Sequence, residues 1–557
     1  MFQKNLEAID NVALKRRLEK ITSYESRIGI SYCITPSNDY ILLKNEVPID
    51  DLNNPRKAIE QLIDKNIKQD MQKNDIIINF GIGLGYLLDI SFNRFPSRIY
   101  IYEPDINLLH FVLSNVDISE HLSSGRVYIT NDLDELTSKL ANTFITKDKV
   151  EILYLPNYAI TKNTELLMLT QKVLDTCKSK IIDINTITKF SRRWMVNTLW
   201  NTSKLQFTKD CYLLSDLENK FNGQTALIAG AGPSLNDNIE NIKANRDKFV
   251  IFAVNKSVKY LFSQGIAPDF VVCLDARNMD TTLNDVSAQL NNCNCIMDIR
   301  TDLSIQKQNF KKLFINFSDS DFFIKKIAKY NKFMKFYEPG GSASTFALMC
   351  AAKLGFSKII LSGIDLAFKD NVIYSNGEIM NRISQEEIMV DNVVKNLVQV
   401  KSVTGKPVYT REDYQNFIHH FSLLIKELNH QGIYNISSFG AEIYGTKNVK
   451  FEELNLYEKA SLAQLAFAEP FKFDLKEFIQ EEFSNINEII AYLSKGVFSP
   501  VLVNKVVNSA LVYPYMQANV LEVLQKNFPP ELAESFITKT KASIKSVVET
   551  LQKSKLI

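Results

Sequence analysis

The hydrophobic pattern between residues 225 and 362 predicts alternating strands and helices. Short continuous apolar runs bounded by turn residues are typical of buried strands, and they occur at 226–229, 249–254, 270–274, 295–297, 313–315 and 359–361. Stretches with helical spacing lie between them, at 236–245, 257–263 and 344–354. Strands that alternate with helices form a mostly parallel, doubly wound sheet with right-handed crossovers.

A second region of the same kind lies upstream. An apolar run at 76–80 is followed by Gly81-Ile82-Gly83-Leu84-Gly85, and a further strand at 98–102 is followed directly by Glu103. This order is the opening of a Rossmann-like fold. Because no methyl-transfer constellation follows, we interpret the region as a Rossmann-like scaffold that has lost its ligand. A nucleotide or S-adenosylmethionine site is the alternative.

The patterns divide the 557 residues into four segments. A single hydrophobic core rarely grows beyond ~250–300 residues, so several domains are expected. We assign an appended region to 1–70, a Rossmann-like domain to 71–215, a central α/β domain to 216–454 and a helical C-terminal domain to 455–557. The last boundary falls where strand patterns stop and helical spacing takes over.

Composition and charge exclude several classes of partner. With 65 basic and 63 acidic residues, the net charge of +2 carries no signature of nucleic-acid binding. Residues 1–21 alternate charged and apolar side chains, unlike a secretory signal, and no run approaches the ~18 apolar residues of a membrane span. Seven scattered cysteines favour a reducing compartment and disfavour a metal site. We therefore expect a cytoplasmic protein.

The turn Gly230-Ala231-Gly232-Pro233-Ser234-Leu235 stands between a predicted strand and a predicted helix. Gly230 and Gly232 would let the backbone come close to a ligand, and free N–H groups at the start of a helix attract anions. Pro233 suits the first helical turn, and Ser234 adds a hydroxyl at the same place. The turn is therefore a candidate phosphate site, and a tight structural turn is the alternative.

Polar side chains also follow other predicted strands. Asn255, Asp275 and Asp365 each come directly after one, and the carboxyl ends of parallel strands meet at one crevice. Taken singly, each residue is more often a helix cap or a turn residue. Their joint placement makes them candidates for a shared site.

A second glycine-rich loop runs from Glu338 to Thr345 and enters a predicted helix. It is a second candidate anion cradle, because it presents glycines and hydroxyls at a helix N-terminus. The residues that would form it are Gly340, Gly341, Ser342 and Ser344. Its alternative is a loop in which Ser342 or Ser344 only caps the helix.

Six short motifs together resemble the motility-associated factor (Maf) flagellin glycosyltransferases. In chain order they are the Gly230–Leu235 turn, Phe252-Ala253-Val254-Asn255, Ile266-Ala267-Pro268-Asp269, Leu274-Asp275, Pro339-Gly340-Gly341-Ser342 and Gly363-Ile364-Asp365. Bacterial sialyltransferases are more distantly similar, since they carry a comparable Gly-x-Gly-Pro-Ser-Leu and Gly-Ile-Asp. The resemblance covers about residues 220–450. It implies that the central segment is a doubly wound α/β glycosyltransferase domain.

The resemblance also implies a reaction and its partners. A nonulosonic acid of the pseudaminic or legionaminic type would pass from a CMP-activated donor to Ser or Thr hydroxyls of flagellin in the cytoplasm. No metal or other cofactor is obligatory for a monophosphate leaving group. The donor is thus a substrate, and flagellin is the protein acceptor.

Roles for individual residues follow from the same resemblance. The Gly230–Leu235 turn would hold the donor phosphate, and Asn255 and Asp275 would line the cytidine or the ribose. The opposite wall would be formed by Ser342, Ser344 and Asp365, with Tyr374 hydrogen-bonded to the departing phosphate.

The general base does not follow from the resemblance, because the sialyltransferases use a histidine. His419 and His420 lie off the apolar stripe of a predicted helix, so we expect both to face solvent. A carboxylate base is our hypothesis, with Asp275, Glu338 and Asp365 as the candidates.

Two other functions compete with glycosyl transfer. Archaeal pterin pyrophosphokinases resemble the same core, so a pterin-type diphosphotransferase that uses ATP and a divalent ion is the first alternative. A non-catalytic protein that binds flagellin through its helical regions is the second.

Overall fold

The computed structural model describes residues 1–68, 70–145, 148–205, 210–254, 256–277, 283–318, 321–368, 397–456, 473–525, 528 and 530–554. Two of the predicted site residues, Asn255 and Tyr374, lie outside this set. The chain divides into two compact units, Met1–Ile187 and Thr188–Ile557. Each unit is described by itself below.

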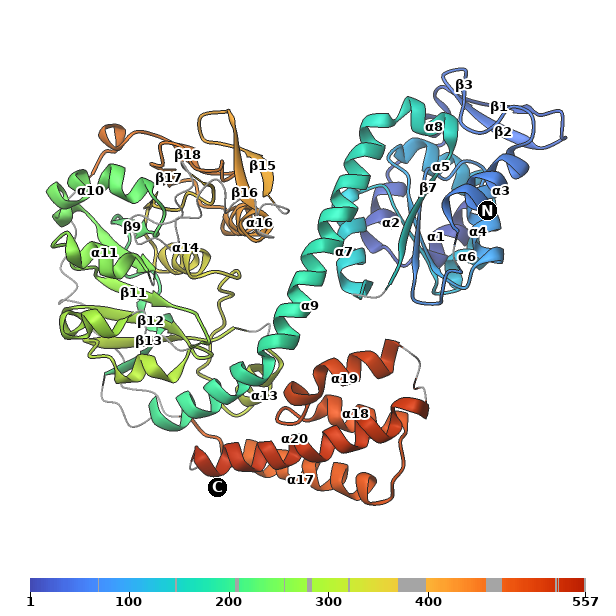
Figure 1. The fold of residues 1–557 in the computed structure, drawn as a ribbon. Helices are drawn as coiled ribbons and strands as arrows, with labels where there is room; N and C mark the ends of the chain where they lie inside the picture. Colours follow the sequence, from blue (N-terminus) through green and yellow to red (C-terminus); the bar gives the residue numbers. More distant parts are fainter. Residues whose placement is uncertain are drawn as a thin grey trace, which may run out of the picture. The chain divides into compact units, whose positions relative to one another are not determined.

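The first unit contains two sheets. Its elements in chain order are α1 (Phe2–Ala8), α2 (Val12–Leu18), β1 (Ile30–Ile34), β2 (Tyr40–Lys44), β3 (Val47–Pro48), α3 (Pro55–Asn66), β4 (Ile76–Phe80), α4 (Tyr86–Arg94), β5 (Arg98–Tyr102), α5 (Ile106–Asn115), α6 (Ser119–Ser123), β6 (Val127–Thr130), α7 (Leu133–Thr143), β7 (Val150–Tyr154) and α8 (Pro156–Thr161). Strands β1, β2 and β3 form a small antiparallel sheet (Figure 1). The larger sheet is parallel in the order β6-β5-β4-β7, as the Rossmann-like pattern predicts.

The core of the first unit explains why β4 is a continuous apolar run. All five of its residues are buried, because helices cover both faces of a parallel sheet. The same core includes Leu6, Leu14 and Ile59 from the N-terminal helices. The region 1–70, expected as an appended region, thus contributes residues from Leu6 to Ile67 to the same hydrophobic core as the Rossmann-like sheet. The boundaries expected at 70, 215 and 454 remain predictions.

The second unit is built on a long parallel sheet. Its elements are β8 (Cys211–Leu213), β9 (Thr225–Ala229), α10 (Ser234–Ala244), β10 (Val250–Val254), α11 (Ser257–Ser263), β11 (Phe270–Cys273), β12 (Asn294–Asp298), β13 (Lys312–Asn316), α13 (Phe322–Ala328), α14 (Ala343–Lys353), β14 (Lys358–Ser362), β15 (Leu397–Lys401), β16 (Pro407–Arg411), α16 (Glu412–Leu428), β17 (Ile433–Asn435), β18 (Lys447–Asn448), α17 (Lys476–Ser494), α18 (Pro500–Asn508), α19 (Tyr513–Gln525) and α20 (Ala533–Lys553). Nine strands pair in the order β18-β17-β14-β9-β10-β11-β12-β13-β8 within the described residues. The mixed α/β class with parallel sheets is therefore confirmed.

The two faces of this sheet are covered by different helices. Alternate strand side chains, such as Leu227 and Ile251, pack in one cluster with α10 and α11. The positions between them, such as Ile228 and Phe252, pack in another cluster with α14 and α16. Because both faces are buried, the strands read as unbroken apolar runs rather than as alternating ones. This is why the sequence pattern located the central strands.

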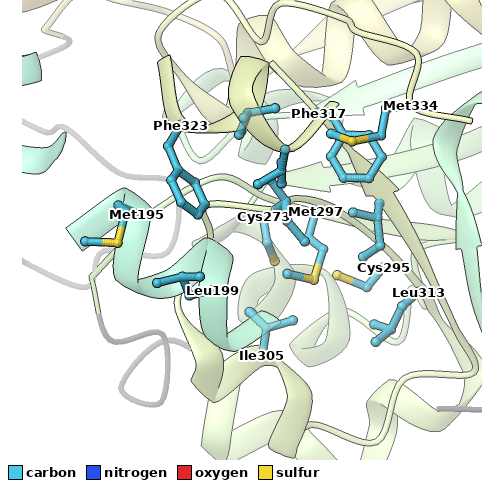
Figure 2. Packing of buried hydrophobic residues seen from close by; sticks show 14 of the residues in the cluster. Met195, Leu199, Cys273, Cys295, Met297, Ile305, Leu313, Phe317, Phe323 and Met334 are labelled. Carbon is cyan, nitrogen blue, oxygen red and sulfur yellow. The ribbon is translucent and has the colours of Figure 1, made fainter. Parts of the chain in front are cut away.

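The C-terminal helices α17 to α20 contribute to the first of these clusters. Phe478, Ile489 and Val547 are buried in it. Figure 2 shows the part of the cluster where Met195 and Leu199 of α9 (Asn163–Leu205) pack near Cys273 and Met297. The helical segment is therefore packed into the core of the second unit.

Three features differ from the sequence-based expectation. The sequence pattern predicts two helical stretches, at 161–182 and 187–205, whereas the structure has one helix of 43 residues, α9 (Asn163–Leu205) (Figure 1). The residues between the two, Asp183 to Thr186, have modest helix propensity but include neither glycine nor proline, so they do not end a helix. The short strands β8, β17 and β18 and the partly exposed β15–β16 pair were not predicted. The two or three residues of β8, β17 and β18 are too few to produce a periodic signal.

Other expectations concern the chain as a whole. No helix within the described ranges is long and apolar enough to cross a membrane. All seven cysteines are free thiols, and five of them are buried. Among the described side chains, no group of three or more His, Cys, Asp or Glu residues could hold a metal ion.

One buried carboxylate makes the stability of the first unit depend on pH. Asp50 is 2% exposed, and its Oδ2 has no hydrogen-bond partner within the described residues. Burial raises the pKa of Asp50 from 3.8 to about 7, with a smaller contribution from the charge of Asp51. Between pH ~4 and pH ~7, Asp50 in the folded state thus keeps a proton that the unfolded chain has already released. This stabilisation is complete below pH ~4 and is lost as the pH rises through ~7.

We predict that Asp50→Asn stabilises the protein more at pH 8 than at pH 5. The amide carries no charge to bury, so it removes a cost of at most about 4 kcal/mol. Thermal denaturation followed by circular dichroism at both pH values measures the effect, with Asp10→Asn as an exposed control. An equal shift at pH 5 and pH 8 would contradict the prediction.

Candidate functional site

The candidate site lies where the order of strands in the large sheet reverses. From β9 the chain proceeds through β10, β11, β12 and β13 in one direction, whereas β14, β17 and β18 lie on the other side. In doubly wound sheets, ligands bind at the carboxyl ends of the strands beside such a switch point. The Gly230–Leu235 turn follows β9, and Gly363-Ile364-Asp365 follows β14. The two most specific motifs in the sequence therefore meet at this point.

Close contact between these two turns explains why glycines are required. The Gly230 N–H donates to the Ser362 carbonyl at 2.8 Å, and the Gly232 N–H donates to the Gly363 carbonyl at 2.7 Å. A Cβ on Gly230 would lie 2.2 Å from the Gly363 oxygen, which is far inside contact distance. The glycines were expected to let a ligand come close to the backbone. In the structure they let the backbone of the neighbouring turn come close.

Asp365 holds the site together. It is 3% exposed, and its Oδ2 accepts the Ser234 N–H at 2.8 Å at the start of α10. Its Oδ1 accepts the Ser234 hydroxyl and, at 2.6 Å, the Ser437 hydroxyl. Burial raises the pKa of Asp365 above its ordinary value, and these hydrogen bonds oppose the rise. With both oxygens engaged, the carboxylate is better placed to position the loops than to take a proton from a substrate.

A third loop joins the other two at Asp365. The Asp365 carbonyl accepts the Ala441 N–H at 2.7 Å, and the Ser437 hydroxyl accepts the Gly440 N–H at 3.2 Å. A Cβ on Gly440 would lie 2.7 Å from the Asp365 Cα, so this approach also depends on a glycine. Loops that are far apart in the sequence thus converge on one carboxylate.

Ser234 has a different role from the one expected. It is fully buried, its hydroxyl donates to Asp365, and the same oxygen accepts the Gly363 N–H at 3.1 Å. The hydroxyl is therefore used inside the protein rather than offered to a ligand. Pro233 is buried as well, so Ala231 and Gly232, both half-buried, form the accessible tip of the turn.

Asp275 lies further along the same edge of the sheet, after β11. Its two oxygens bind the Arg277 side chain, with Nε at 3.0 Å and the terminal nitrogen at 2.8 Å. Burial would raise the pKa of Asp275, but hydrogen bonds from Arg277 and its charge prevail and lower it. A carboxylate with a lowered pKa is a weak base. The geometry therefore favours Asp275 as a fixed negative charge over Asp275 as the proton acceptor.

Helix α9 fixes the loop that carries Asp275. The Asn197 amide donates to the carbonyls of Ala276 at 3.1 Å and Arg300 at 2.9 Å. The Asn201 amide donates to the carbonyls of Ile299 and Thr301. One turn of helix thereby ties together the loops that follow β11 and β12.

A charged group that the sequence analysis missed lies at the end of β12. Asp298 is fully buried, and its Oδ1 accepts Arg300 Nε at 2.7 Å. Asn316, which ends β13, donates to Asp298 Oδ2 at 3.0 Å. A polar residue directly after each of these predicted strands was the available signal, because the same position identified Asp275.

Glu338 is the accessible carboxylate of the site. It is exposed, and its Oε1 accepts the Ser318 hydroxyl at 2.6 Å. It directly precedes Pro339-Gly340-Gly341, so it lies at the start of the second glycine-rich loop. Unlike Asp365, it is exposed and not enclosed in the core.

The second glycine-rich loop is capped in the way that the sequence suggested. The Ser342 hydroxyl accepts the Thr345 N–H at 3.1 Å, and Thr345 Oγ1 accepts the Ser342 N–H at 3.0 Å, at the start of α14. Ser342 is therefore the cap, and Ser344 lies half-buried in the first turn of the helix. Gly340 and Gly341 adopt φ values of 70° and 88°, which favour glycine.

The expectation for His420 was wrong. His419 is exposed as predicted, but His420 is half-buried, and its Nδ1 lies 3.2 Å from the Gly340 carbonyl. Helix α16 places His420 against the second glycine-rich loop. The apolar stripe of the helix gives no information about this contact, because the loop is distant in the sequence. An Nδ1–H donor to Gly340 would leave Nε2 as an acceptor.

The glycine turn of the first unit is closed. Glu103, at the end of β5, accepts the N–H groups of Ile82 at 3.1 Å and Asp105 at 2.9 Å and the Tyr158 hydroxyl at 2.5 Å. A Cβ on Gly81 would lie 2.7 Å from the Tyr158 ring, so this ring covers the turn at Gly81. In nucleotide-binding proteins with this fold, an acid at this position binds the ribose. Here Glu103 accepts hydrogen bonds from the protein itself instead. This arrangement favours the interpretation of a scaffold that has lost its ligand.

Fold and site together define a doubly wound α/β protein with paired glycine turns at its switch point. Comparison with known proteins gives three similarities. The solved structure of a Maf glycosyltransferase from Magnetospirillum magneticum AMB-1 has the same fold, with a TM-score of 0.67, 16% identity, and coverage of 99% of this chain and 95% of that chain. The resemblance to Maf proteins is thereby confirmed at the level of fold.

The other two similarities cover parts of the chain. Residues 201–371 match the family described as 6-hydroxymethylpterin diphosphokinase MptE-like. An uncharacterized protein of Treponema pallidum (strain Nichols) is 36% identical over 94 residues. That match spans 17% of this chain and 42% of the relative. The family match contains both glycine turns of the switch point and Asp365.

The contact between the turns leads to a prediction about Gly363. A Cβ there would lie 2.5 Å from the Gly230 oxygen, and its φ of 69° is unfavourable for other residues. Gly363→Ala should destabilise the second unit by about 4 kcal/mol or more, the range of severe core changes.

Gly405→Ala is the matched control. Its φ is 81°, but no atom lies within 4 Å of the added Cβ, so only the backbone cost of about 1–2 kcal/mol applies. Urea denaturation of both variants measures the difference. Equal losses would mean that the turns are not in close contact.

Proposed function

We propose that this chain is a glycosyltransferase that moves a nonulosonic acid from a CMP-activated donor to Ser or Thr hydroxyls of flagellin. The observation that carries the proposal is the switch-point assembly around Asp365, found within a fold shared along 99% of the chain with a Maf glycosyltransferase. Two of the motifs that resemble Maf proteins, the Gly230–Leu235 turn and Gly363-Ile364-Asp365, form this assembly. Flagellin as acceptor and the cytoplasm as location belong to the same proposal.

The donor phosphate would bind at the accessible tip of the Gly230–Leu235 turn. Ala231 and Gly232 are half-buried there, and α10, of 11 residues, begins directly behind them. The partial positive charge of a helix N-terminus stabilises an anion. Asp365 holds this helix end against the neighbouring turn, so it would set the position of the phosphate without touching it.

The acceptor hydroxyl needs a base, and Glu338 is the carboxylate that fits. Asp365 is enclosed and fully engaged, and Asp275 is paired with Arg277. Glu338 is exposed and is held by Ser318 beside the second glycine-rich loop. It would accept the proton of the attacking hydroxyl as the bond to the anomeric carbon forms and the CMP phosphate leaves. His420 would act as a positioning residue that fixes the Gly340 carbonyl.

A pterin-type diphosphotransferase is the second candidate, because residues 201–371 match the MptE-like family. That match covers strands β8 to β14 of the large sheet but not β17, β18, the β15–β16 pair or the helices α17 to α20. The Maf structure is similar along the whole chain, these parts included. The likeness to Maf therefore accounts for more of the molecule.

A transfer assay separates the candidates. Purified full-length chain is incubated with purified flagellin and CMP-pseudaminic acid or CMP-legionaminic acid, and flagellin is measured by mass spectrometry. We expect a mass increase of one or more nonulosonic acid residues and release of CMP. EDTA-sensitive consumption of ATP with a pterin would instead establish the diphosphotransferase, and flagellin binding without CMP release would establish a non-catalytic role.

The role of the base gives a prediction within the same assay. Glu338→Gln should lower the transfer rate by about 10²–10⁴-fold, the usual contribution of a general base, and leave the affinity for CMP unchanged. Glu427→Gln, an exposed glutamate on α16, is the control and should retain the full rate. A Glu338→Gln variant with the wild-type rate would exclude this residue as the base.

A further inference from the structure

A cavity in the first unit lies apart from the residues discussed for transfer. Its volume is about 630 Å³, within the range of small-molecule sites. One wall is the face of the β1–β2 sheet, and the other comes from α3, α4, α5 and α6. Gly85 lines it, whereas Gly81, at the other end of the same turn, is covered by Tyr158. The cavity is therefore distinct from the closed crevice of the Rossmann-like sheet.

Aromatic side chains form the sheet wall of the cavity. Tyr32 is 66% exposed and Tyr40 is 50% exposed, and their rings meet edge to face with centroids 5.9 Å apart. Tyr32 on β1 is paired with Leu42 on β2, which also lines the cavity. The Tyr86 hydroxyl donates to the Tyr40 carbonyl at 2.9 Å and so connects the sheet to α4. Rigid strands thus present two open aromatic rings to the cavity.

Charged side chains of both signs line the opposite wall. The Arg56 guanidinium lies 4.4 Å from the centre of the Tyr86 ring, and one of its nitrogens lies 3.7 Å from Asp89 Oδ2. His121 Nε2 is 3.5 Å from Asp89 Oδ1. Asp117 lies at the same wall and binds Lys4 at 2.8 Å. These pairs are partly exposed, so their hydrogen-bonding groups remain accessible from the cavity.

This combination selects a class of ligand. An apolar ligand would desolvate Asp89 and Asp117 without compensation, which is costly. A phosphate-bearing ligand would face these two carboxylates, and the cations beside them, Arg56 and Lys4, are already paired with them. A sugar ring has an apolar C–H face that lies against aromatic rings and a rim of hydroxyls that both donate and accept hydrogen bonds. Its hydroxyls match carboxylates, an imidazole and a guanidinium at once.

We infer that this cavity is a saccharide-binding site, separate from the site of transfer. The inference rests on the geometry of the first unit and does not depend on the proposed function. The Tyr32 and Tyr40 rings would receive the face of the sugar, and Asp89, Asp117 and Arg56 would bind its hydroxyl edge.

Ligand-observed saturation-transfer NMR and calorimetry on the full-length chain test this inference. The probes are N-acetylglucosamine, galactose and N-acetylneuraminic acid, each added alone without CMP or flagellin. We expect at least one probe to bind with a Kd of about 1 mM, as is usual for a single weakly held ring. Tyr32→Ala and Tyr40→Ala should each raise this Kd at least ~10-fold, since each removes an exposed aromatic surface.

Tyr24→Ala is the matched control, because Tyr24 is 79% exposed in the same unit but does not line the cavity. It should leave the Kd unchanged. Binding that survives both cavity substitutions, or no binding of any of the three probes, would overturn the inference. Binding of acceptor peptides that depends on Tyr32 and Tyr40, without saccharide binding, would also overturn it and assign the cavity to a peptide. Because transfer activity is not measured, failure here leaves the proposed function untouched.

Discussion

The second unit depends on one carboxylate at the start of one helix. Asp365 accepts the first N–H of α10 and two hydroxyls, from Ser234 and Ser437. A buried carboxylate is costly unless its oxygens are hydrogen-bonded, and here the partners come from two other loops, the turn after β9 and the loop after β17. Removing the carboxylate would leave buried donors unpaired in each loop. The same bonds that offset its burial therefore determine where the accessible tip of the Gly230–Leu235 turn lies.

The glycines follow from this constraint. For α10 to approach Asp365, the turns after β9 and β14 must pass within hydrogen-bond distance of one another, and a side chain on Gly230 or Gly363 would prevent it. A motif of this kind is usually explained by contact with a ligand. Here the first requirement is internal: the turn must fit its neighbour before it can hold a phosphate. The two explanations are compatible, because the half-buried tip at Ala231 and Gly232 remains accessible.

The sequence allowed prediction of features that depend on neighbours in the chain. The central strands were located because a sheet buried on both faces requires continuous apolar runs, and Ser342 was a foreseeable cap because the cap and its partner Thr345 lie three residues apart. The role of Ser234 was not foreseeable, since its partner Asp365 lies 131 residues away. His420 was misjudged for the same reason, because Gly340 is 80 residues distant. The sequence shows which residue type is present at each position, but it does not show which distant residue will be its hydrogen-bond partner.

The two units use the same turn in opposite ways. In the first, Glu103 and Tyr158 fill the crevice beside Gly81, so this end of the glycine turn is closed. In the second, the corresponding acid, Asp365, accepts the first N–H of α10, and the tip of the turn at Ala231 and Gly232 stays half-buried. An acid after a strand near a glycine turn is thus not sufficient to identify a nucleotide site. The deciding observation is whether a bulky side chain occupies the place beside the turn, as Tyr158 does in the first unit.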